Sequence, residues 1–398
     1  MKTYFKNIKD SFKLKHYVNY IAVTAVLVIF AALYYMGALN RSTPNLLTQI
    51  GYSIILAVSL NLVVGLLGEL SLGHGGFMCV GAYLGALVMN SLDGKLPIML
   101  ILFIGMIVGG IAAAIFGLIV GLPALRLRGD YLAIVTLAFG EIVRNICKNL
   151  DFLGGAQGLD SKWYSAYLSK GKDTIPLFVP TLIAVLGMLF IIQNLNRSKH
   201  GRAITAIRDN EIAAKAMGIN VTYYKLLVFV VSAFFAGIAG VIYTGTTSPI
   251  QYSFFSYNYS IEILVMVVLG GMGSIGGSII ASSLIIYINF ILKSQLSGDM
   301  AAIKTLVYAI ILIVMVIYKN APALKNVRER FNVKVLMEYV KTKIFKVERD
   351  VSDITDDAGE WDEIPTKIIT DEILSTEFVL TTYTPDKPDK ADYSKKGD

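Results

Sequence analysis

The chain has 398 residues, of which 55% are hydrophobic and only 16% are charged, and its formal net charge is +7. A soluble domain carries about 25% charged residues, so this composition excludes an ordinary soluble protein and indicates an integral membrane protein. The basic excess does not indicate nucleic-acid binding, because the Lys and Arg residues flank apolar stretches and form no patch interleaved with aromatic residues.

Ten stretches are predicted to be membrane-embedded helices, since about 20 residues of α-helix cross the hydrocarbon core. The first, residues 17–39, is longer than the apolar core of a cleaved signal, so we expect it to be retained. Three stretches are less clear: 131–150 contains charges, 260–271 is short enough to be re-entrant, and 274–292 follows it closely. The remaining six are residues 46–68, 75–92, 97–121, 176–195, 222–244 and 303–318.

The distribution of Lys and Arg predicts how these spans are oriented. The basic residues gather in residues 1–16, at Arg126 and Arg128, in residues 197–225 and from residue 319 onward. Cytoplasmic loops are rich in such residues, and an even number of predicted spans separates each cluster from the next. We therefore expect an all-α, multi-pass protein of the cell membrane with about ten transmembrane helices and both termini in the cytoplasm.

The same pattern divides the chain into three parts. Residues 1–16 are expected to be a basic cytoplasmic N-terminus, residues 17–318 the transmembrane domain, and residues 319–398 a cytoplasmic tail. The first part of the tail is basic with interspersed apolar residues, as in a helix lying on a membrane surface. Its acidic and proline-containing remainder is predicted to be disordered.

Two glycine-rich junctions, residues 68–76 and 270–277, interrupt the apolar spans. Non-helical backbone at membrane depth is tolerated only where protein or a water-filled cavity surrounds it. Glu69 and His74 form an ionisable pair in the first junction, which either ties a broken helix together or acts in passage or gating. The residues expected to line or shape the translocation pathway are Glu69, His74, Gly270, Gly271 and Gly273.

No motif in the sequence supports catalysis or cofactor binding. The lysine in residues 171–173 lacks the upstream glycine and the following hydroxyl residue of a phosphate-binding loop. Cys79 and Cys147 both fall in apolar stretches and have no metal-ligand spacing. We therefore expect neither an enzymatic activity nor a cofactor, and any ATP energy has to come from a partner.

Two charged clusters have helical spacing. Glu141 and Arg144 stand three residues apart, which is typical of a structural ion pair, with a substrate site as the alternative. Residues 201–218 lie in a predicted cytoplasmic loop and are expected to form a short helix, with Glu211 pairing along it and Gly218 as its C-terminal cap. Charges on several sides of this helix suit docking into a groove of another protein, and a solvated connector is the alternative.

Four blocks of sequence, in order, resemble the permeases of branched-chain amino acid ABC transporters of the LivM/LivH type. The blocks are GELSLGHGGF at 68–77 with GAY at 81–83, LRGDYLAIVTLAFGEI at 127–142, the segment from GRA at 201 to GIN at 218–220, and VLGGMG at 268–273. The likeness covers roughly residues 45–320. It implies a type II-like ABC importer fold in which residues 201–218 are the cytoplasmic coupling helix.

The resemblance also implies the partners of the chain. These are a second homologous permease subunit, two ATP-binding-cassette ATPase subunits and an extracytoplasmic substrate-binding protein, within a lipid bilayer and without nucleic acid. Ile212 stands where the general coupling motif has Glu, although the following alanines and the glycine are in register. The candidate coupling residues are Arg202, Arg208, Glu211, Ala213, Ala214 and Gly218.

The substrates implied by the nearest resemblance are leucine, isoleucine and valine. Urea or short amides are the alternative within the same broad family. An ion-driven secondary transporter is a rival from a different class, but it would need mid-membrane carboxylates and an internal repeat. A membrane enzyme built on Glu69 and His74 would need a metal set or a nucleophile that the sequence lacks.

Overall fold

The computed structural model describes residues 43–125, 130–169 and 175–295, together with Ile310 and Ile313. The predictions for residues 1–16, 17–39 and 319–398 lie outside the described residues, as does nearly all of the predicted span 303–318. Within the described ranges the regular elements are helices, with one isolated β-bridge between Leu159 and Ile250.

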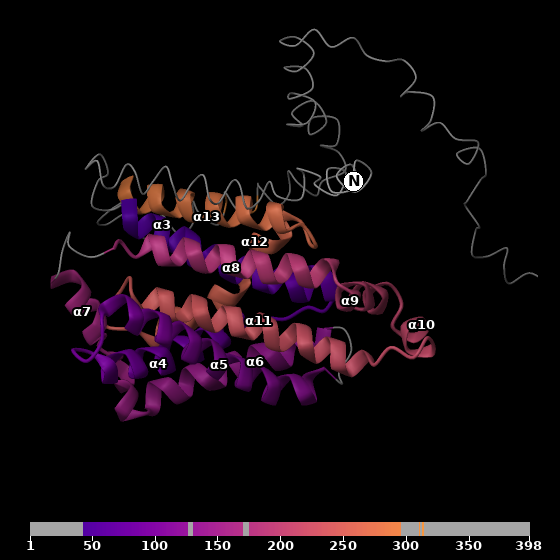
Figure 1. The fold of residues 1–398 in the computed structure, drawn as a ribbon, viewed down its shortest axis with the longest axis horizontal. Helices are drawn as coiled ribbons and strands as arrows, with labels where there is room; N and C mark the ends of the chain where they lie inside the picture. The colour runs from indigo at the N-terminus through magenta and orange to yellow at the C-terminus, as the bar shows by residue number, and fades with distance from the viewer. Residues whose placement is uncertain (1–42, 126–129, 170–174, 296–309, 311–312, 314–398) are drawn as a thin grey trace, which may run out of the picture. The chain divides into compact units, whose positions relative to one another are not determined.

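Eight long helices form the bundle in this part of the chain (Figure 1). They are α3 (Thr43–Asn61), α4 (His74–Leu92), α5 (Ile98–Ala124), α6 (Asp130–Asn149), α8 (Phe178–Arg197), α11 (Val221–Thr244), α12 (Tyr257–Gly270) and α13 (Ile275–Gln295). The π-helix η2 (Leu62–Leu67) continues α3. The shorter elements are η3 (Asp151–Leu153), η4 (Gly155–Gln157), α7 (Lys162–Ser169), α9 (Lys199–Asp209), α10 (Glu211–Ala216) and η6 (Tyr252–Phe255).

Six helical stretches in the described residues are long and apolar enough to cross a membrane. They are Thr43–Leu67, His74–Leu92, Ile98–Ala124, Phe178–Arg197, Val221–Thr244 and Ile275–Leu292. Each coincides with a span predicted from the sequence, which confirms a multi-pass helical membrane protein. Helix α12 has 14 residues, and the prediction of ten transmembrane helices stays a prediction.

Helix α3 lies at the centre of one half of the bundle, because its side chains are buried on all sides from Ser53 to Asn61. It contacts α8, α11, α12 and α13. In the other half, α4, α5 and α11 approach closely at glycines, as small residues allow in membranes. A Cβ atom on Gly81 would overlap the backbone of Gly237, and one on Gly109 would lie 2.8 Å from the Gly81 carbonyl oxygen.

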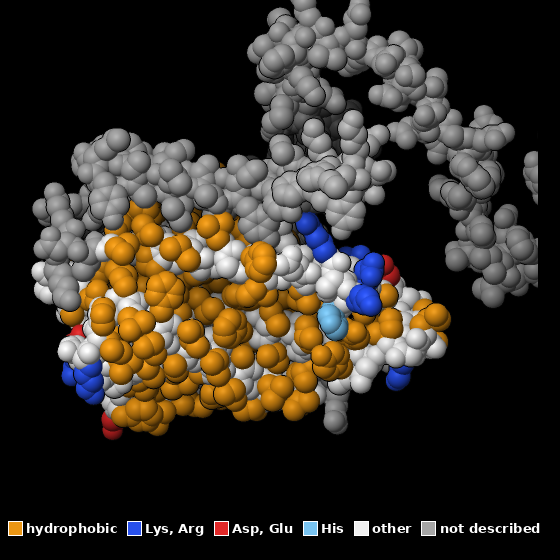
Figure 2. Space-filling view, in the orientation of Figure 1, with side chains coloured by type: hydrophobic (Ala, Val, Ile, Leu, Met, Phe, Trp, Pro, Cys, Tyr) orange, Lys and Arg blue, Asp and Glu red, His pale blue; other side chains and the backbone are white. Residues whose placement is uncertain are grey.

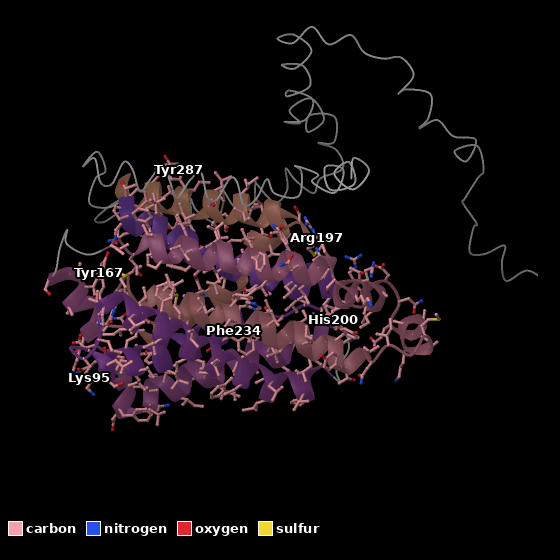
Figure 3. All side chains as sticks on the ribbon, in the orientation of Figure 1. Lys95, Tyr167, Arg197, His200, Phe234 and Tyr287 are labelled. Atoms are coloured by element: carbon pink, nitrogen blue, oxygen red, sulfur yellow. The ribbon has the colours of Figure 1, made fainter. Side chains whose placement is uncertain are left out.

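The outer surface of the bundle suits a lipid environment. Hydrophobic side chains cover the face seen in Figure 2, and Lys and Arg side chains gather at its ends. Figure 3 shows the same division, with Lys95 and His200 at opposite ends and Phe234 between them. Charged groups are costly in the hydrocarbon region and favourable beside it, so the bundle axis is expected to run across the membrane.

We expect α7 and α10 to lie on opposite sides of the membrane. Leu168 in α7 is 57% exposed and Met217, just after α10, is 82% exposed. In a background with Cys79→Ala and Cys147→Ala, a membrane-impermeant maleimide should label Leu168→Cys in intact cells. It should label Met217→Cys only in inside-out vesicles. Labelling of Met217→Cys in intact cells would contradict the cytoplasmic orientation of α10.

Candidate functional site

A buried lysine joins the glycine-rich junction after α3 to the segment between α8 and α11. Lys225 Nζ donates to Glu69 Oε1 at 2.7 Å and to Glu211 Oε2 at 3.0 Å. Only 5% of the Lys225 side chain is exposed, compared with 15% for Glu69 and 40% for Glu211. Because a buried charge is tolerated only when it is paired, the three side chains hold one another in place. We call Glu69, Lys225 and Glu211 the lysine clamp.

Each member of the lysine clamp is positioned by a helix terminus. Gly68, with a φ of 82°, ends η2 and turns the chain, and Glu69 N then donates to Val63 O at 3.2 Å. Glu211 is the first residue of α10, which Asn210 caps by accepting from Ala213 N at 3.0 Å. Lys225 lies one turn into α11. The clamp thus joins three segments that the chain order separates.

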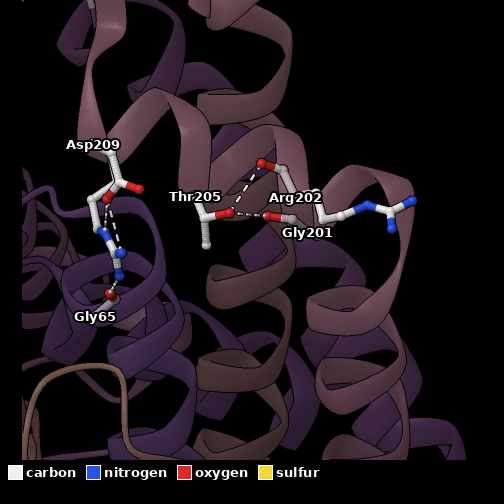
Figure 4. A network of polar contacts seen from close by, with 6 residues as sticks. Gly65, Gly201, Arg202, Thr205 and Asp209 are labelled. Carbon is white, nitrogen blue, oxygen red and sulfur yellow. Dashed lines mark hydrogen bonds and ion pairs between the residues drawn. The ribbon is translucent and has the colours of Figure 1, made fainter. Parts of the chain in front are cut away.

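Arg208 makes a second contact between the segment that joins α8 to α11 and the end of α3 (Figure 4). Its Nη1 donates to Gly65 O at 3.2 Å, while Nε and Nη2 donate to Asp209 Oδ1 at 3.1 and 2.9 Å. Carbonyls in the last turn of a helix need a donor from outside the helix. Arg208 supplies that donor, so α9 is attached to η2 independently of the lysine clamp.

Asn61 connects the end of α3 to the second glycine-rich junction. Its Nδ2 donates to Ser274 O at 3.1 Å and to Ser278 Oγ at 2.9 Å, and its Oδ1 accepts from Gly273 N at 2.8 Å. Gly65 lies against the same turn, since a Cβ atom there would overlap Gly273 N. The second junction, 270–277, therefore packs against the end of α3 and against η2, the helix that leads into the first junction.

The glycines of the second junction are required by their backbone. Gly271 has a φ of 99° and Gly273 a φ of 82°, a region that residues with a Cβ atom rarely adopt. A Cβ atom on Gly270 would lie 2.6 Å from Ser278 N. These positions shape the turn between α12 and α13. That they line a translocation pathway stays a prediction.

The predicted pairing of Glu69 with His74 is wrong. His74 Nε2 lies 2.8 Å from Ser232 Oγ, and the Ser232 hydroxyl donates to Ser59 O at 2.6 Å. His74 opens α4 and is 1% exposed. The Glu69 carboxylate instead forms an ion pair with Lys225. His74 therefore connects α4 to α11 and α3, and a role in passage is untested.

The predicted single helix over 201–218 is two helices. Asn210, with φ −157° and ψ 103°, is extended and separates α9 from α10. The break turns Glu211 toward Lys225, so the expected pairing of Glu211 along its own helix is wrong. The prediction for the other end is confirmed, because Gly218 has a φ of 82° and its N–H donates to Lys215 O at 3.1 Å.

The exposed face of this segment is apolar in part. Ile212 is 77% exposed and Met217 is 82% exposed. We call these two residues, which lie in and directly after α10, the α10 knob. Of the candidate coupling residues, Arg202, Arg208, Ala213 and Gly218 are exposed and Ala214 is buried. Arg208 and Glu211 also bind the transmembrane domain.

The predicted ion pair in α6 is confirmed. Arg144 Nη2 and Nε donate to Glu141 Oε2 at 2.6 and 2.9 Å. The other carboxylate oxygen, Oε1, accepts from Tyr257 N at 3.0 Å, which is one of the unpaired donors at the start of α12. Glu141 therefore also connects α6 to α12, a contact that its helical spacing did not predict.

A surface hollow lies at the end of α11 that is remote from Lys225. Its volume is about 410 Å³, and it is lined by Tyr243, Thr247, Ser248, Pro249, Gln251, Ser253 and Phe254. The rings of Tyr243 and Phe254 stack with their centroids 4.3 Å apart. A hollow of this size is in the range of small-molecule sites, about 300–1,000 Å³, so it is a candidate entrance for substrate.

Comparison with known proteins identifies the family. Residues 42–317 match the family described as branched-chain amino acid transport system / permease component. The chain belongs to this family. The permease is 33% identical over 340 residues to the high-affinity branched-chain amino acid transport system permease protein LivM of Salmonella typhimurium, covering 78% of this chain and 76% of that protein.

Two further relatives carry the same name. The permease is 33% identical over 342 residues to LivM of Escherichia coli, covering 78% of this chain and 76% of that protein. It is 29% identical over 269 residues to the probable branched-chain amino acid transport permease protein LivM of Methanocaldococcus jannaschii, covering 64% and 76% respectively. The family resemblance inferred from the four sequence blocks is confirmed.

Sequence reasoning missed Lys225 and Asn61 as parts of the site. Lys225 was grouped with the cytoplasmic basic residues, although it stands within the predicted span 222–244. Asn61 is a polar side chain in an apolar stretch. A polar group inside a predicted span needs a partner, and that signal could have pointed to both residues.

Proposed function

We propose that this permease is the membrane subunit of an ABC importer for leucine, isoleucine and valine. It works with a second homologous permease, two ATP-binding-cassette ATPases that hydrolyse the ATP, and an extracytoplasmic binding protein that delivers the substrate. The names of the relatives support this substrate class. The observation that carries the mechanism is the connection of the exposed helix α10 to the transmembrane bundle through the lysine clamp.

The mechanism begins at α10. The α10 knob fits an apolar groove on an ATPase, as a short helix commonly does on a partner surface. When the ATPase moves, α10 moves with it. Glu211 transmits the displacement to Lys225, and Lys225 transmits it to Glu69. Movement of the ATPase therefore reaches the non-helical backbone after α3 through ion pairs that are largely buried.

From the first junction the movement reaches the second. Arg208 holds Gly65 O, and Asn61 holds the turn at Gly273 and Ser274. Because α12 and α13 meet at this turn, displacement of η2 changes the positions of both helices relative to α3. Each link has a defined donor and acceptor, so the connection is a contiguous physical network of the kind that carries coupling between distant sites.

Substrate uptake in the reconstituted complex tests the proposed function. Proteoliposomes that contain both permeases and ATPases, with the binding protein outside, should accumulate labelled leucine, isoleucine and valine when ATP is inside. Urea and short amides serve as competing substrates in parallel samples. Accumulation of urea without leucine would replace the proposed substrate class. Uptake driven by an ion gradient without ATP would overturn the importer mechanism.

Charges placed on the α10 knob should detach the ATPase. Ile212→Glu with Met217→Glu puts two carboxylates into an apolar contact, and the ATPase affinity should fall at least about tenfold, or about 1.4 kcal/mol. Leu168→Glu in α7 is the matched control, because Leu168 is also exposed, at 57%, but at the other end of the bundle. Co-purification and ATPase stimulation measure the effect. Unchanged association of the double variant would contradict the docking role.

A further inference from the structure

Basic and aromatic side chains gather where α8 ends and where α9 and α11 begin. Arg197 is the last residue of α8. Lys199 and His200 open α9, and Arg202 follows one turn later. Tyr223 stands in the first turn of α11. All five residues are exposed, and we call them the α9 interfacial patch.

The packing of α9 turns its cations outward. Ser198 is extended, with φ −74° and ψ 174°, and its hydroxyl caps the start of the helix. On the inner side of α9, Ile204 and Ile207 are buried against the bundle. Because an α-helix has 3.6 residues per turn, Lys199 and Arg202 lie on the opposite side of α9 from these isoleucines.

His200 attaches the patch to α11. Its ring centroid lies 5.8 Å from that of Tyr224, and the rings of Tyr224 and Tyr223 meet edge to face at 5.3 Å. Tyr223 remains 52% exposed. Tyrosine is enriched at membrane–water interfaces, because its ring is apolar and its hydroxyl is polar. The patch therefore combines cations with an aromatic side chain that is typical of headgroup depth.

The cations of the patch have no counter-charge among the described residues. Arg197, Lys199 and Arg202 form no ion pair there, whereas nearby Arg208 pairs with Asp209 at 2.9 Å. The sequence contains no Asp or Glu from residue 174 to residue 208. Three positive charges within six residues therefore attract an anion from outside this chain.

The depth of the patch follows from α8. Ile191, which is 48% exposed, is the last large apolar side chain exposed on this helix. Arg197 lies six residues further along, or about 9 Å at 1.5 Å per residue, and the headgroup region adds roughly 5–8 Å on each side of the hydrocarbon core. In Figures 2 and 3, Arg197 and His200 lie at the end of the bundle where the continuous hydrophobic surface stops. The patch is therefore level with the lipid headgroups.

We propose that the α9 interfacial patch binds the phosphate groups of anionic phospholipids. The guanidinium groups of Arg197 and Arg202 match a phosphate with two parallel hydrogen bonds, and Lys199 adds a compact positive charge. Basic residues beside a membrane surface are attracted to anionic headgroups in this way. The patch thus anchors α9 to the membrane surface.

A partner protein in water meets α10 before it meets the patch. Figure 1 shows α10 beyond α9 along the bundle, further from the transmembrane helices. Asn210 is extended and separates the two helices, so the cations of α9 form a group of their own. Lipid holds α9 and leaves the α10 knob to contact a protein. Arg202, a candidate coupling residue in the sequence, is thereby assigned to lipid.

Site-specific photo-crosslinking tests the patch. The full-length permease, with the subunits that co-purify with it, is placed in nanodiscs of equal parts phosphatidylglycerol and phosphatidylcholine. p-Benzoylphenylalanine replaces Tyr223, and the control replaces Tyr257, which is 48% exposed and lies beside Glu141. Lipid adducts at position 223 should favour phosphatidylglycerol at least about fivefold, the effect of roughly one cation at an anionic surface. Position 257 should show no such preference.

Neutralising the cations tests whether their charge causes the preference. Arg197→Gln with Lys199→Gln and Arg202→Gln should remove it at position 223, whereas Arg197→Lys with Arg202→Lys keeps all three charges and should retain most of it. Three results would overturn the proposal: equal reaction of both lipids at position 223 with the cations intact, an unchanged preference in the neutralised variant, or a protein product at position 223 in place of lipid. The first comparison needs no substitution of a cation, so it stands even where the neutralised variant fails to fold.

Discussion

Replacing Lys225 with methionine is expected to abolish ATP-coupled uptake and to destabilise the permease. The substitution preserves the length of the side chain but leaves Glu69 and Glu211 without their shared cation. Removing one partner of a buried ion pair typically costs about 3–5 kcal/mol. We expect the lower part of this range, because Glu211 is 40% exposed and is partly screened by water.

Thermal unfolding in detergent and leucine uptake measure the two effects. Lys215→Met is the matched control, since Lys215 is an exposed lysine of α10 and its loss should leave both quantities nearly unchanged. Adding Glu69→Gln and Glu211→Gln to Lys225→Met should recover stability without recovering coupling, because no buried charge is then left unpaired. Normal uptake by Lys225→Met would show that the lysine clamp does not carry the coupling.

Substituting alanine for Gly65 is expected to block transport as well. A Cβ atom at this position would overlap both Asn61 Oδ1 and Gly273 N. Neither neighbour can yield freely, because the two are hydrogen-bonded to each other. Such overpacking costs about 1–3 kcal/mol, and relieving it requires that η2 and the turn at Gly273 separate. We therefore expect uptake to fall by more than about tenfold, or about 1.4 kcal/mol in coupling.

Gly187→Ala provides the control for Gly65→Ala. Gly187 lies in α8, and a Cβ atom there would have nothing within 4 Å. Alanine is favoured over glycine in a helix by about 1 kcal/mol, so this variant should be at least as stable as the natural protein and should transport normally. If both variants transport equally, the close contact between η2 and the turn at Gly273 is not needed for uptake.

The spans could be predicted because a helix that crosses the hydrocarbon core needs a run of about 20 mostly apolar residues. Helices α4 and α11 begin within one residue of their predicted starts. A long apolar run leaves few positions at which a membrane span could begin. The break at Asn210 was missed. Charges spaced three and four residues apart favour a continuous helix, but an asparagine that caps a new helix competes with that pattern.

The contacts of the site could not be predicted in the same way. Glu69 and Lys225 are 156 positions apart, and Asn61 and Gly273 are 212 apart. Sequence reasoning could compare only residues close along the chain, so it paired Glu69 with His74, five residues further on. Glycine content located both junctions correctly, because non-helical backbone at membrane depth has few alternatives, but it gave no indication that the second junction packs against the end of α3.

The shortness of α12 has an electrostatic consequence for the substrate. Its 14 residues extend about 21 Å at 1.5 Å per residue, whereas the hydrocarbon core is about 30 Å thick. Since α12 meets α13 at the end near Asn61, the shortfall lies at the opposite end, where residues 245–256 and their hollow fill the difference. We expect water to fill this hollow, which would thin the low-dielectric barrier by roughly a third. An amino acid carries two full charges. The distance over which it must lose its hydration is therefore expected to be shorter than the full thickness of the hydrocarbon core.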